Sequence, residues 1–344
     1  MKDTAIYALT NEAGKTGRLI ADRLEADLYL PRDYAATHGA IPFDRILRLV
    51  EKQFHRYSKH IFITAAGVAI RAIAPHIRSK TRDPAVVVLD QAGAYCISLL
   101  SGHLGGANKL AERVARVTGG KAVITTATDS EGLISLDLVA LEKGMSISNM
   151  EALKDVNSAV LNGDYLHVFD PRDYLGFREC PPEGVRIRNL KSRDAWTQGM
   201  VGVWVDWHHK DPEKGMLLLH PGCIVAGIGC NRGTKAGEIV QLVRETFREN
   251  GLSIRSLKAL GTIDAKANEK GLVRASEILG VPLMFFDGRE ISAIEVPHPS
   301  ETVMRRMGVQ SVCEATAILG TGKGTLIVPK TKGRNSTIAL ALEP

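Results

Sequence analysis

The sequence predicts an α/β protein in which an N-terminal domain of the parallel-sheet type and a C-terminal α/β domain with a mixed sheet are joined by a smaller middle module. Three observations support this. Short apolar runs alternate with amphipathic stretches over residues 1–130, as in a layered sheet with crossover helices. The pattern weakens among Pro and Gly turns over residues 131–215. It becomes regular again over residues 216–344, a normal length for a domain.

The N-terminal stretch alternates expected strands and helices. Apolar runs predict buried strands at residues 4–10, 28–30, 60–67, 85–89 and 121–126. Helical spacing of apolar residues lies between them, at residues 18–26, 43–57, 68–75 and 111–117. Ligands of parallel sheets bind at the carboxyl ends of the strands. We therefore expect Gly67, the loop at 101–106 and Asp129 to share such an edge.

One loop of this domain carries several groups that suit chemistry. It follows the apolar run at 85–89 and a Gly-containing turn at 90–93, and it leads into a helix. Gly102, Gly105 and Gly106 permit a positive φ and a close approach of backbone to ligand, and amides at the helix start favour an anion. His103 is the side chain of the loop that moves a proton near neutral pH. A tight strand-to-helix connection with a locally bonded histidine is the alternative, since glycine strings are a weak signal.

The C-terminal stretch repeats the pattern and ends in two strands that are expected to pair. Strands are predicted at residues 217–220, 223–229, 282–286, 325–329 and 336–341. Helices are expected at residues 236–249, 265–279 and 299–307, and a further one opens within 308–314. Thr234 suits the N-cap of the first of these helices, and Asn250-Gly251 ends it. The middle stretch offers only short strand candidates, so its fold stays open.

The composition describes an ordinary globular protein with a basic balance. Of 344 residues 44% are hydrophobic, and no apolar run approaches the roughly 18 residues that span a bilayer. A net charge of +6 and a pI near 9.0 suit a polyanionic small molecule, because a cleft of one charge concentrates the opposite charge. No basic run is interleaved with aromatic residues, which argues against a nucleic-acid partner. Without a signal-peptide segment or a membrane span, we expect a cytoplasmic protein.

The cysteines and two glycine-rich strings invite site assignments that their spacing rejects. Five scattered cysteines without a Cys-x-x-Cys pair predict reduced, buried thiols, with neither a disulfide framework nor a metal site. Residues 11–17, with glycines at 14 and 17, are expected to form a loop. The Gly-Lys-Thr at 14–16 within it is no P-loop, because Leu9 stands where the first glycine of a P-loop belongs. Gly233, one position too late, breaks a dinucleotide fingerprint that starts at Gly227. For Cys230, packing at a tight turn is favoured over a nucleophile, because no histidine is nearby in sequence.

Several longer strings occur in a fixed order at both ends of the chain. The N-terminal ones are Ile-Thr-Ala-Ala-Gly-Val-Ala-Ile-Arg (63–71), Asp-Pro-Ala-Val-Val-Val-Leu-Asp (83–90) and Leu-Leu-Ser-Gly-His-Leu-Gly-Gly-Ala-Asn (99–108). The C-terminal ones are Gly-Ile-Gly-Cys-Asn-Arg-Gly-Thr (227–234), Leu-Gly-Thr-Ile-Asp-Ala-Lys-Ala-Asn-Glu (260–269), Gly-Val-Gln-Ser-Val-Cys-Glu-Ala (308–315) and Gly-Lys-Gly (322–324). Together they resemble the CbiG family of cobalamin biosynthesis.

The resemblance implies a hydrolase of the early-cobalt route to vitamin B12. Such an enzyme opens the ring A lactone of cobalt-precorrin-5A and releases the extruded carbon as acetaldehyde, giving cobalt-precorrin-5B. The implied substrate is a polycarboxylated cobalt-tetrapyrrole, so cobalt arrives within the substrate and no further cofactor is expected. The resemblance also allows transient contact with neighbouring enzymes of the pathway. A non-catalytic carrier of a corrinoid intermediate is the alternative, and it would need the cationic cleft without the acid–base groups.

Roles for the acid–base residues follow from this reaction as hypotheses. Lactone opening needs an activated water, stabilisation of an oxyanion and a proton for the leaving oxygen. We expect His103 to act as general base, with the amides of Gly105 and Gly106 near the oxyanion. Glu314 and Asp264, each at a loop-to-helix start, are the acid–base candidates of the C-terminal domain. Glu314 equally suits a carboxylate stabilised by the helix dipole.

Substrate contacts are expected from cations and from backbone in the shared strings. Arg71, Arg232, Lys266 and Lys323 are candidate clamps for carboxylates, and solvated surface charge is the alternative for each. The other expected contacts are Gly67, Ser101, Gly102, Gly105, Gly106, Asn108, Gly229, Gly233 and Thr234. Asn231 stands where the family pattern suggests a basic residue, so Arg232 and Lys235 are expected to supply that contact.

Overall fold

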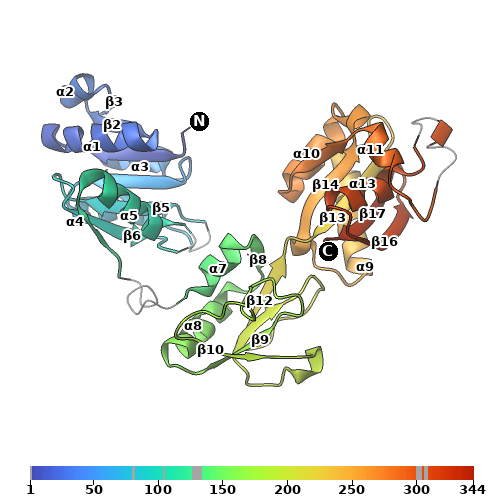
Figure 1. Ribbon diagram of the computed structural model, residues 1–344. Coiled ribbons are helices and arrows are strands. Elements are labelled where there is room, and N and C mark those ends of the chain that lie inside the picture. The colour runs from blue at the N-terminus through green and yellow to red at the C-terminus, as the bar shows by residue number, and fades with distance from the viewer. Residues whose placement is uncertain (1, 80–81, 104, 126–133, 300–303, 306–308) are drawn as a thin grey trace. The chain divides into compact units, whose positions relative to one another are not determined.

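The computed structural model describes residues 2–79, 82–103, 105–125, 134–299, 304–305 and 309–344. Within these residues the strands form three β-sheets (Figure 1). The chain divides into two compact units, one of Met1–Val139 with Pro182–Gly184 and one of Ala140–Pro181 with Val185–Pro344. The predicted fold class is confirmed: the N-terminal sheet is largely parallel and the C-terminal sheet is mixed.

The N-terminal sheet has the order β3-β2-β1-β4-β5-β6-β7. Its parallel part consists of β1 (Thr4–Ala8), β2 (Asp27–Pro31), β3 (Ile41–Phe43), β4 (Lys59–Ile63) and β5 (Ala85–Leu89). β6 (Tyr95–Leu100) runs antiparallel to β5, and β7 (Lys121–Val123) runs parallel to β6. β6 was not predicted from the sequence.

The reversal at β6 corrects one prediction about the site. Because Leu100 pairs with Val86, the loop after β6 lies at the amino end of β5. Gly67 follows the carboxyl end of β4, which is the opposite edge of the sheet. The expectation that Gly67 and the 101–106 loop share an edge is therefore wrong. Asp129, the third member of that group, lies outside the described residues.

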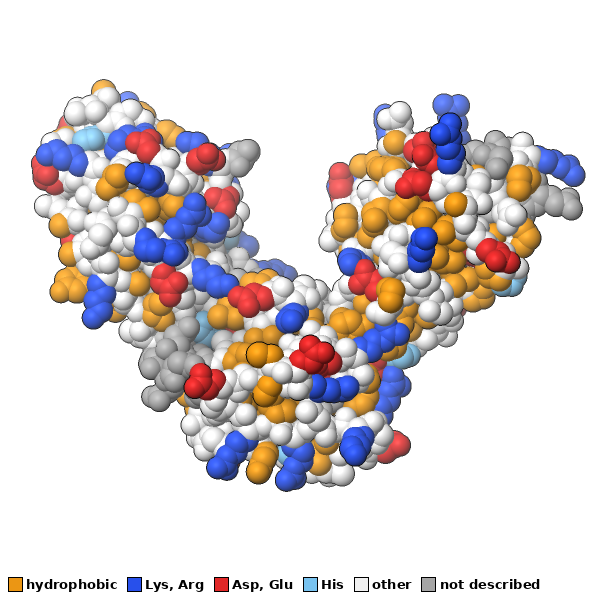
Figure 2. Space-filling model, viewed as in Figure 1, with side chains coloured by type: hydrophobic (Ala, Val, Ile, Leu, Met, Phe, Trp, Pro, Cys, Tyr) orange, Lys and Arg blue, Asp and Glu red, His pale blue; other side chains and the backbone are white. Residues whose placement is uncertain are grey.

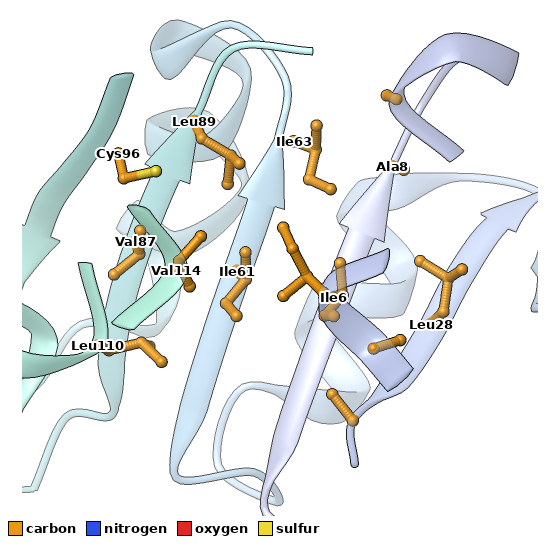
Figure 3. Packing of buried hydrophobic residues seen from close by; sticks show 14 of the residues in the cluster. Ile6, Ala8, Leu28, Ile61, Ile63, Val87, Leu89, Cys96, Leu110 and Val114 are labelled. Atoms are coloured by element: carbon orange, nitrogen blue, oxygen red, sulfur yellow. The ribbon is translucent and has the colours of Figure 1, made fainter. Parts of the chain in front are cut away.

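Helices cover both faces of this sheet. They are α1 (Asn11–Leu24), α2 (Arg32–Ala35), α3 (Ile46–Gln53), α4 (Ala66–Ile73) and α5 (Ala107–Thr118), with 3₁₀ turns η1 (Ala36–His38) and η2 (Ala74–His76). α1 and α5 pack over Ile6, Ile61 and Val87 on one face (Figure 3). α3 and α4 pack over Tyr7, Phe62 and Val88 on the other.

α1 begins seven residues before the predicted helix at 18–26. Thr10 caps it, since its Oγ1 accepts a hydrogen bond from the Ala13 amide at 3.1 Å. The glycines at 14 and 17 had suggested a loop, but Gly17 faces the sheet. A Cβ there would lie 2.7 Å from the Leu28 side chain. The glycine thus permits close packing of helix on sheet.

The middle sheet has the order β10-β9-β11-β12-β8. Its strands are β8 (Met145–Ile147), β9 (Tyr165–Phe169), β10 (Arg186–Asn189), β11 (Gly202–Val205) and β12 (Met216–Pro221), with β8 antiparallel to β12 and the others parallel. Associated helices are α7 (Leu136–Glu142), α8 (Leu153–Leu161), η3 (Met150–Ala152) and η4 (Arg193–Ala195). Phe169, Trp196 and Trp204 form the centre of its small core.

The C-terminal sheet has the order β15-β14-β13-β17-β16. β13 (Ile224–Cys230), β14 (Leu257–Ile263) and β15 (Leu283–Phe286) are parallel, and β17 (Ser336–Leu342) is antiparallel to both β13 and β16 (Thr325–Lys332). The predicted pairing of the last two strands is confirmed. The helices are α9 (Ala236–Glu249), α10 (Lys270–Leu279), α11 (Gly288–Ser292) and α13 (Val312–Gly320), with η5 (Ile254–Ser256) and η6 (Asp264–Lys266).

The bounds predicted for the helix at 236–249 are confirmed, but its N-cap and the start of the following helix differ from the prediction. The N-cap of α9 is Lys235, and Thr234 instead donates its hydroxyl to the carbonyls of Asn231 and Asn335, so it fastens the loop and not the helix. α10 starts at Lys270 because the residues from Asp264 to Lys266 form a 3₁₀ turn. The helix expected at 299–307 falls largely outside the described residues.

Two glycines bring α13 unusually close to the C-terminal sheet. A Cβ on Gly227 would lie 1.8 Å from the Cys313 carbonyl oxygen, and one on Gly261 would lie 2.8 Å from that of Thr316. Backbone therefore packs directly on backbone at these positions. This contact holds the start of α13 against the carboxyl ends of β13 and β14, where a pocket forms.

Candidate functional site

A pocket of about 340 Å³ opens at the carboxyl ends of β13 and β14. The start of α13 and the turn between β16 and β17 complete its wall. The residues that line it are Gly229, Cys230, Asn231, Arg232, Thr262, Ile263, Lys266, Ser311, Val312, Cys313, Lys330, Lys332, Gly333, Arg334, Asn335, Ser336 and Thr337. It thus contains Gly229, Arg232 and Lys266 of the predicted contacts, with Gly233 and Thr234 beside it.

The lining of this pocket has one sign of charge. It includes five cationic side chains and, among the described residues, no carboxylate. Lys and Arg side chains elsewhere on the visible surface are interspersed with Asp and Glu (Figure 2). Among the described residues, Lys266 of the lining has an acidic partner, Glu269, at 3.6 Å. Such a lining suits an anion with several carboxylates.

The loop at 231–234 is held rigidly beside the pocket. The Asn231 amide donates to the Asn335 carbonyl at 2.9 Å, and Thr234 donates to the same carbonyl at 3.2 Å. Gly233 has φ of +75°, and its amide donates to Glu269 Oε1 at 3.0 Å. Arg232 is exposed in this loop. The backbone of the shared string therefore shapes the rim, and Arg232 supplies a cation.

Two polar groups of the pocket wall distinguish it from a simple basic surface. Ser336 is 4% exposed, and its hydroxyl has no hydrogen-bond partner among the described residues. A buried hydroxyl without a partner costs free energy unless a ligand or water satisfies it. Burial raises the pKa of the Cys230 thiol, although Lys266 opposes the effect. Cys230 is therefore held as a thiol and not as a reactive thiolate.

Glu314 and Asp264, the predicted acid–base pair, lie in different surroundings. Glu314 is fully buried in the first turn of α13, and it accepts hydrogen bonds from the His298 amide and ring and from the Lys330 amide at 2.9–3.1 Å. Asp264 is exposed after β14, where Oδ1 accepts a hydrogen bond from the Ala265 amide. Neither lines the pocket, but Asp264 lies between Ile263 and Lys266, which do.

Lys323 lies at the other end of the same sheet. It precedes β16, which begins at Thr325 and reaches the pocket at Lys330 and Lys332. The length of that strand, seven residue steps, separates the two ends by about 23 Å. The structure thus brings Arg232 and Lys266 together with Lys330, Lys332 and Arg334, and it leaves Lys323 apart.

In the N-terminal unit, Gly67 and Arg71 lie in α4 at the carboxyl edge of the sheet. Both are exposed, and Arg71 donates to the Gly67 carbonyl at 3.2 Å. A second pocket, of about 670 Å³, opens at this edge where β1, β4 and β5 end. Its lining is mainly apolar, with Thr10, Thr64, Asp90 and Gln91 as the polar members. No cation lines it.

The described residues of the loop at 101–106 are tightly wound at the opposite edge. Ser101 has φ of +58° and donates its hydroxyl to the Asp83 carbonyl at 3.0 Å. A Cβ on Gly105 would lie 2.4 Å from that of Ser101, and one on Gly102 would lie 2.7 Å from Asn108 Oδ1. Gly106, with φ of +82°, is the N-cap of α5. The backbone conformation at these positions requires glycine, and Ser101 and Asn108 stabilise it.

His103 of this loop contacts Ser135 and Asp137, neither of which was predicted from the sequence. Its Nδ1 lies 2.9 Å from Ser135 Oγ and 3.5 Å from Asp137 Oδ1, and Ser135 also donates to that carboxylate. Burial raises the pKa of Asp137, but hydrogen bonds from His103 and Ser135 outweigh it, so the net pKa is lowered. No local signal marks these residues, because they follow His103 by 32 and 34 positions.

Comparisons with known proteins cover nearly the whole chain. Family profiles match in order: "Cobalamin synthesis G N-terminal" over residues 48–129, "Cobalamin biosynthesis central region" over 134–221 and "Cobalamin synthesis G C-terminus" over 224–341. A Priestia megaterium protein named "Cobalt-precorrin-5A hydrolase" is 33% identical over 304 residues, 86% of this chain and 81% of that protein. A Salmonella typhimurium protein of the same name is 32% identical over 351 residues, 98% of this chain and 97% of that one.

One solved structure aligns along the full chain. It is that of a cobalamin biosynthesis protein G homologue from Sulfolobus solfataricus, at 21% identity and a TM-score of 0.37, covering 100% of this chain and 98% of that one. In the part of the chain that the structure describes, none of the helices has both the length and the apolar character needed to cross a membrane.

Proposed function

Because this chain belongs to the CbiG family and is a hydrolase of cobalamin biosynthesis, we propose that it opens the ring A lactone of cobalt-precorrin-5A and then releases acetaldehyde to give cobalt-precorrin-5B. The observation that carries this proposal is the cation-lined pocket of the C-terminal domain. The substrate carries many acetate and propionate groups, and each is a planar acceptor for Lys or Arg. Metal chemistry enters with the substrate, which brings its own cobalt.

The pocket binds part of the substrate periphery in this proposal. Its volume of about 340 Å³ suits side-chain carboxylates and not a whole macrocycle. Arg232 and Lys266 hold carboxylates from one side, and the cations of β16 and the following turn hold them from the other. The hydroxyl of Ser336 donates to a carboxylate oxygen and so gains the partner that it lacks. Lys323 takes no part in this contact.

His103 is the general base of lactone opening. It takes a proton from water as the oxygen attacks the lactone carbonyl, and the amide of Gly105 stabilises the oxyanion. The Gly106 amide, which was expected to share this role, already donates to the His103 carbonyl at 2.9 Å. The protonated ring then gives a proton to the leaving oxygen, which yields an alcohol and a carboxylic acid that ionises to the solvent. In the second step a base removes the alcohol proton, the carbonyl of acetaldehyde forms, and the electron pair of the broken C–C bond passes to the macrocycle, which is then protonated.

The two carboxyl candidates of the C-terminal domain receive different roles in this proposal. Asp264 is exposed beside the pocket, so we assign proton transfer to it. Glu314 already accepts hydrogen bonds on both oxygens, so we assign it the role of holding the start of α13 in place. The enzyme acts in the cytoplasm in this proposal, with transient contacts to neighbouring enzymes and none to nucleic acid.

Incubation of the purified protein with cobalt-precorrin-5A tests the proposal. Trapped acetaldehyde and a corrinoid that has lost the matching two-carbon unit are the expected products. His103→Ala is expected to abolish product formation while binding persists. Binding by the wild-type protein without acetaldehyde would instead favour a corrinoid carrier. Turnover by His103→Ala near the wild-type rate would refute the assignment of the base.

A further inference from the structure

We infer that Asp137 and Ser135 are positioning residues that select the proton-accepting nitrogen of His103. The inference rests on the proposed role of His103 as general base. The three residues come from the loop before α5 and from the start of α7, and all lie within one compact unit of the chain. Ser135 and Asp137 are 5% and 6% exposed, so the arrangement is buried and its geometry is restrained.

The hydrogen bonds determine which ring nitrogen carries the proton. An ionised carboxylate only accepts hydrogen bonds, and a serine hydroxyl has a single hydrogen to donate. Ser135 donates that hydrogen to Asp137 Oδ1. Its contact of 2.9 Å with His103 Nδ1 must therefore be one in which the ring nitrogen donates. The neutral ring thus has its hydrogen on Nδ1, and Nε2 is the basic nitrogen.

The carboxylate also stabilises the product of proton transfer. Asp137 Oδ1 lies 3.5 Å from Nδ1, and the side chains of His103 and Asp137 are 12% and 8% exposed. A charge pair at this distance is screened little in such a buried place. The lowered pKa of Asp137 keeps it ionised, although burial alone acts in the opposite direction. When His103 takes a proton from water, the positive ring faces this negative charge.

The chain of contacts resembles in function the carboxylate of a serine protease, which holds a histidine in one tautomer. The arrangement differs from that of the protease because Ser135 lies between the Asp137 carboxylate and the His103 ring and does not act as a nucleophile. Its hydroxyl is committed to Asp137 on the side of the ring that faces away from the basic nitrogen. Ser135 is therefore proposed to position the ring and not to act as a nucleophile.

Two variants and a control test the inference. Asp137→Asn is expected to lower kcat by a hundredfold or more with KM within about twofold, because the neutral amide no longer fixes the tautomer. Ser135→Ala is expected to lower kcat about tenfold, since the carboxylate remains near Nδ1. Asp27→Asn is the control, because it removes a partly buried carboxylate of the same domain that accepts from Tyr57 at 2.7 Å. It is expected to keep the wild-type kcat.

A spectroscopic readout separates this inference from the proposed function. Nitrogen-15 NMR of ring-labelled histidine is expected to show His103 with its hydrogen on Nδ1 in the wild-type protein, and largely on Nε2 in Asp137→Asn. His103→Ala identifies the signal. An unchanged tautomer and kcat in both Asp137→Asn and Ser135→Ala would overturn the inference. Full activity of His103→Ala would overturn the proposed base. The tautomer measurement would still show whether Ser135 and Asp137 fix the hydrogen of His103 on Nδ1.

Discussion

Removal of one cation at each end of the C-terminal sheet tests where the substrate carboxylates bind. Lys332 lines the pocket, whereas Lys323 lies beyond the far end of β16, about 23 Å away along the strand. Both lysines are exposed in the same domain, so Lys332→Gln and Lys323→Gln remove the same net charge. The two variants differ in whether the lysine that is removed lines the pocket.

The expected difference in binding follows from distance and exposure. A hydrogen bond to a charged group contributes about 1.5–3 kcal/mol, but an exposed pair contributes at most about 1 kcal/mol. Lys332 is exposed, so we expect a loss of about 1 kcal/mol, or roughly a fivefold weaker affinity. At about 23 Å in water a charge pair contributes only about 0.2 kcal/mol before screening. With a Debye length near 8 Å, Lys323→Gln is expected to change nothing measurable.

Steady-state kinetics of acetaldehyde release is the assay. Lys332→Gln is expected to raise KM roughly fivefold with kcat unchanged, which is the signature of lost uniform binding. The effect should shrink as salt is added. If both variants raise KM equally, the overall charge attracts the substrate and the pocket does not hold it. If Lys323→Gln alone raises KM, the substrate binds at the far end of the sheet.

Three further predictions concern other parts of the chain. Tyr7 donates to Nδ1 of the buried His60, and burial lowers the pKa of His60 to about 4. As the pH falls below 6.5, His60 therefore binds a proton in the unfolded chain before it does so in the folded protein. By pH 4 the folded state is expected to lose about 3 kcal/mol of stability, a loss that His60→Gln should not show. Urea unfolding at both pH values measures the difference. Gly227→Ala places a Cβ against the Cys313 carbonyl and is expected to destabilise by about 3 kcal/mol in urea unfolding, whereas Gly237→Ala, with open space around it, is expected to be neutral or slightly stabilising. Iodoacetamide at neutral pH should label the exposed Cys180 well before Cys230, whose pKa burial raises, and peptide mass spectrometry that found the reverse order would contradict this.

The buried strands of both α/β domains were predictable because their chemistry is continuous along the chain. Strands covered on both faces read as unbroken apolar runs, as β5 does from Ala85 to Leu89. The direction of a strand leaves no such trace. β6 turns back on β5 through a tight turn in which the Asp90 carboxylate accepts from the amides of Ala92 and Tyr95. The sequence shows a turn there, but it does not show that the next segment pairs beside the last.

Glycines were a second reason why predicted elements differ from the observed ones, because the effect of a glycine depends on the residues against which it packs. The glycines at 14 and 17 suggested a loop, yet both lie within α1. Gly17 removes a side chain where helix meets sheet, as Gly227 does for α13. A glycine costs a helix about 1 kcal/mol relative to alanine. Close packing on the sheet outweighs that cost here, and only the three-dimensional contact shows it.

Only part of the lining of the C-terminal pocket could be predicted from the sequence. Arg232 and Lys266 lie in strings that resemble the family's, and each follows the end of a parallel strand, where ligands are expected. Lys330 and Lys332 lie on an antiparallel strand that arrives at the same edge from elsewhere in the chain. Their position depends on β16 lying in register with β17 beside β13. Lys323 was expected in the site because it lies in the Gly-Lys-Gly string of the resemblance, and its distance from the pocket shows only in the fold.

The structure changes the reason for which His103 is proposed as a base. The glycine loop indicated a histidine near a strand end, and the edge rule for parallel sheets then placed it with Gly67. The reversal of β6 removes that support, because His103 lies at the amino edge. What favours His103 as a base is instead the polar pair on its Nδ1, Ser135 and Asp137. If the chemistry of the N-terminal domain depends on the carboxyl edge, Asp137→Asn will leave kcat intact; if it depends on His103, the loss in that variant will follow the change of tautomer.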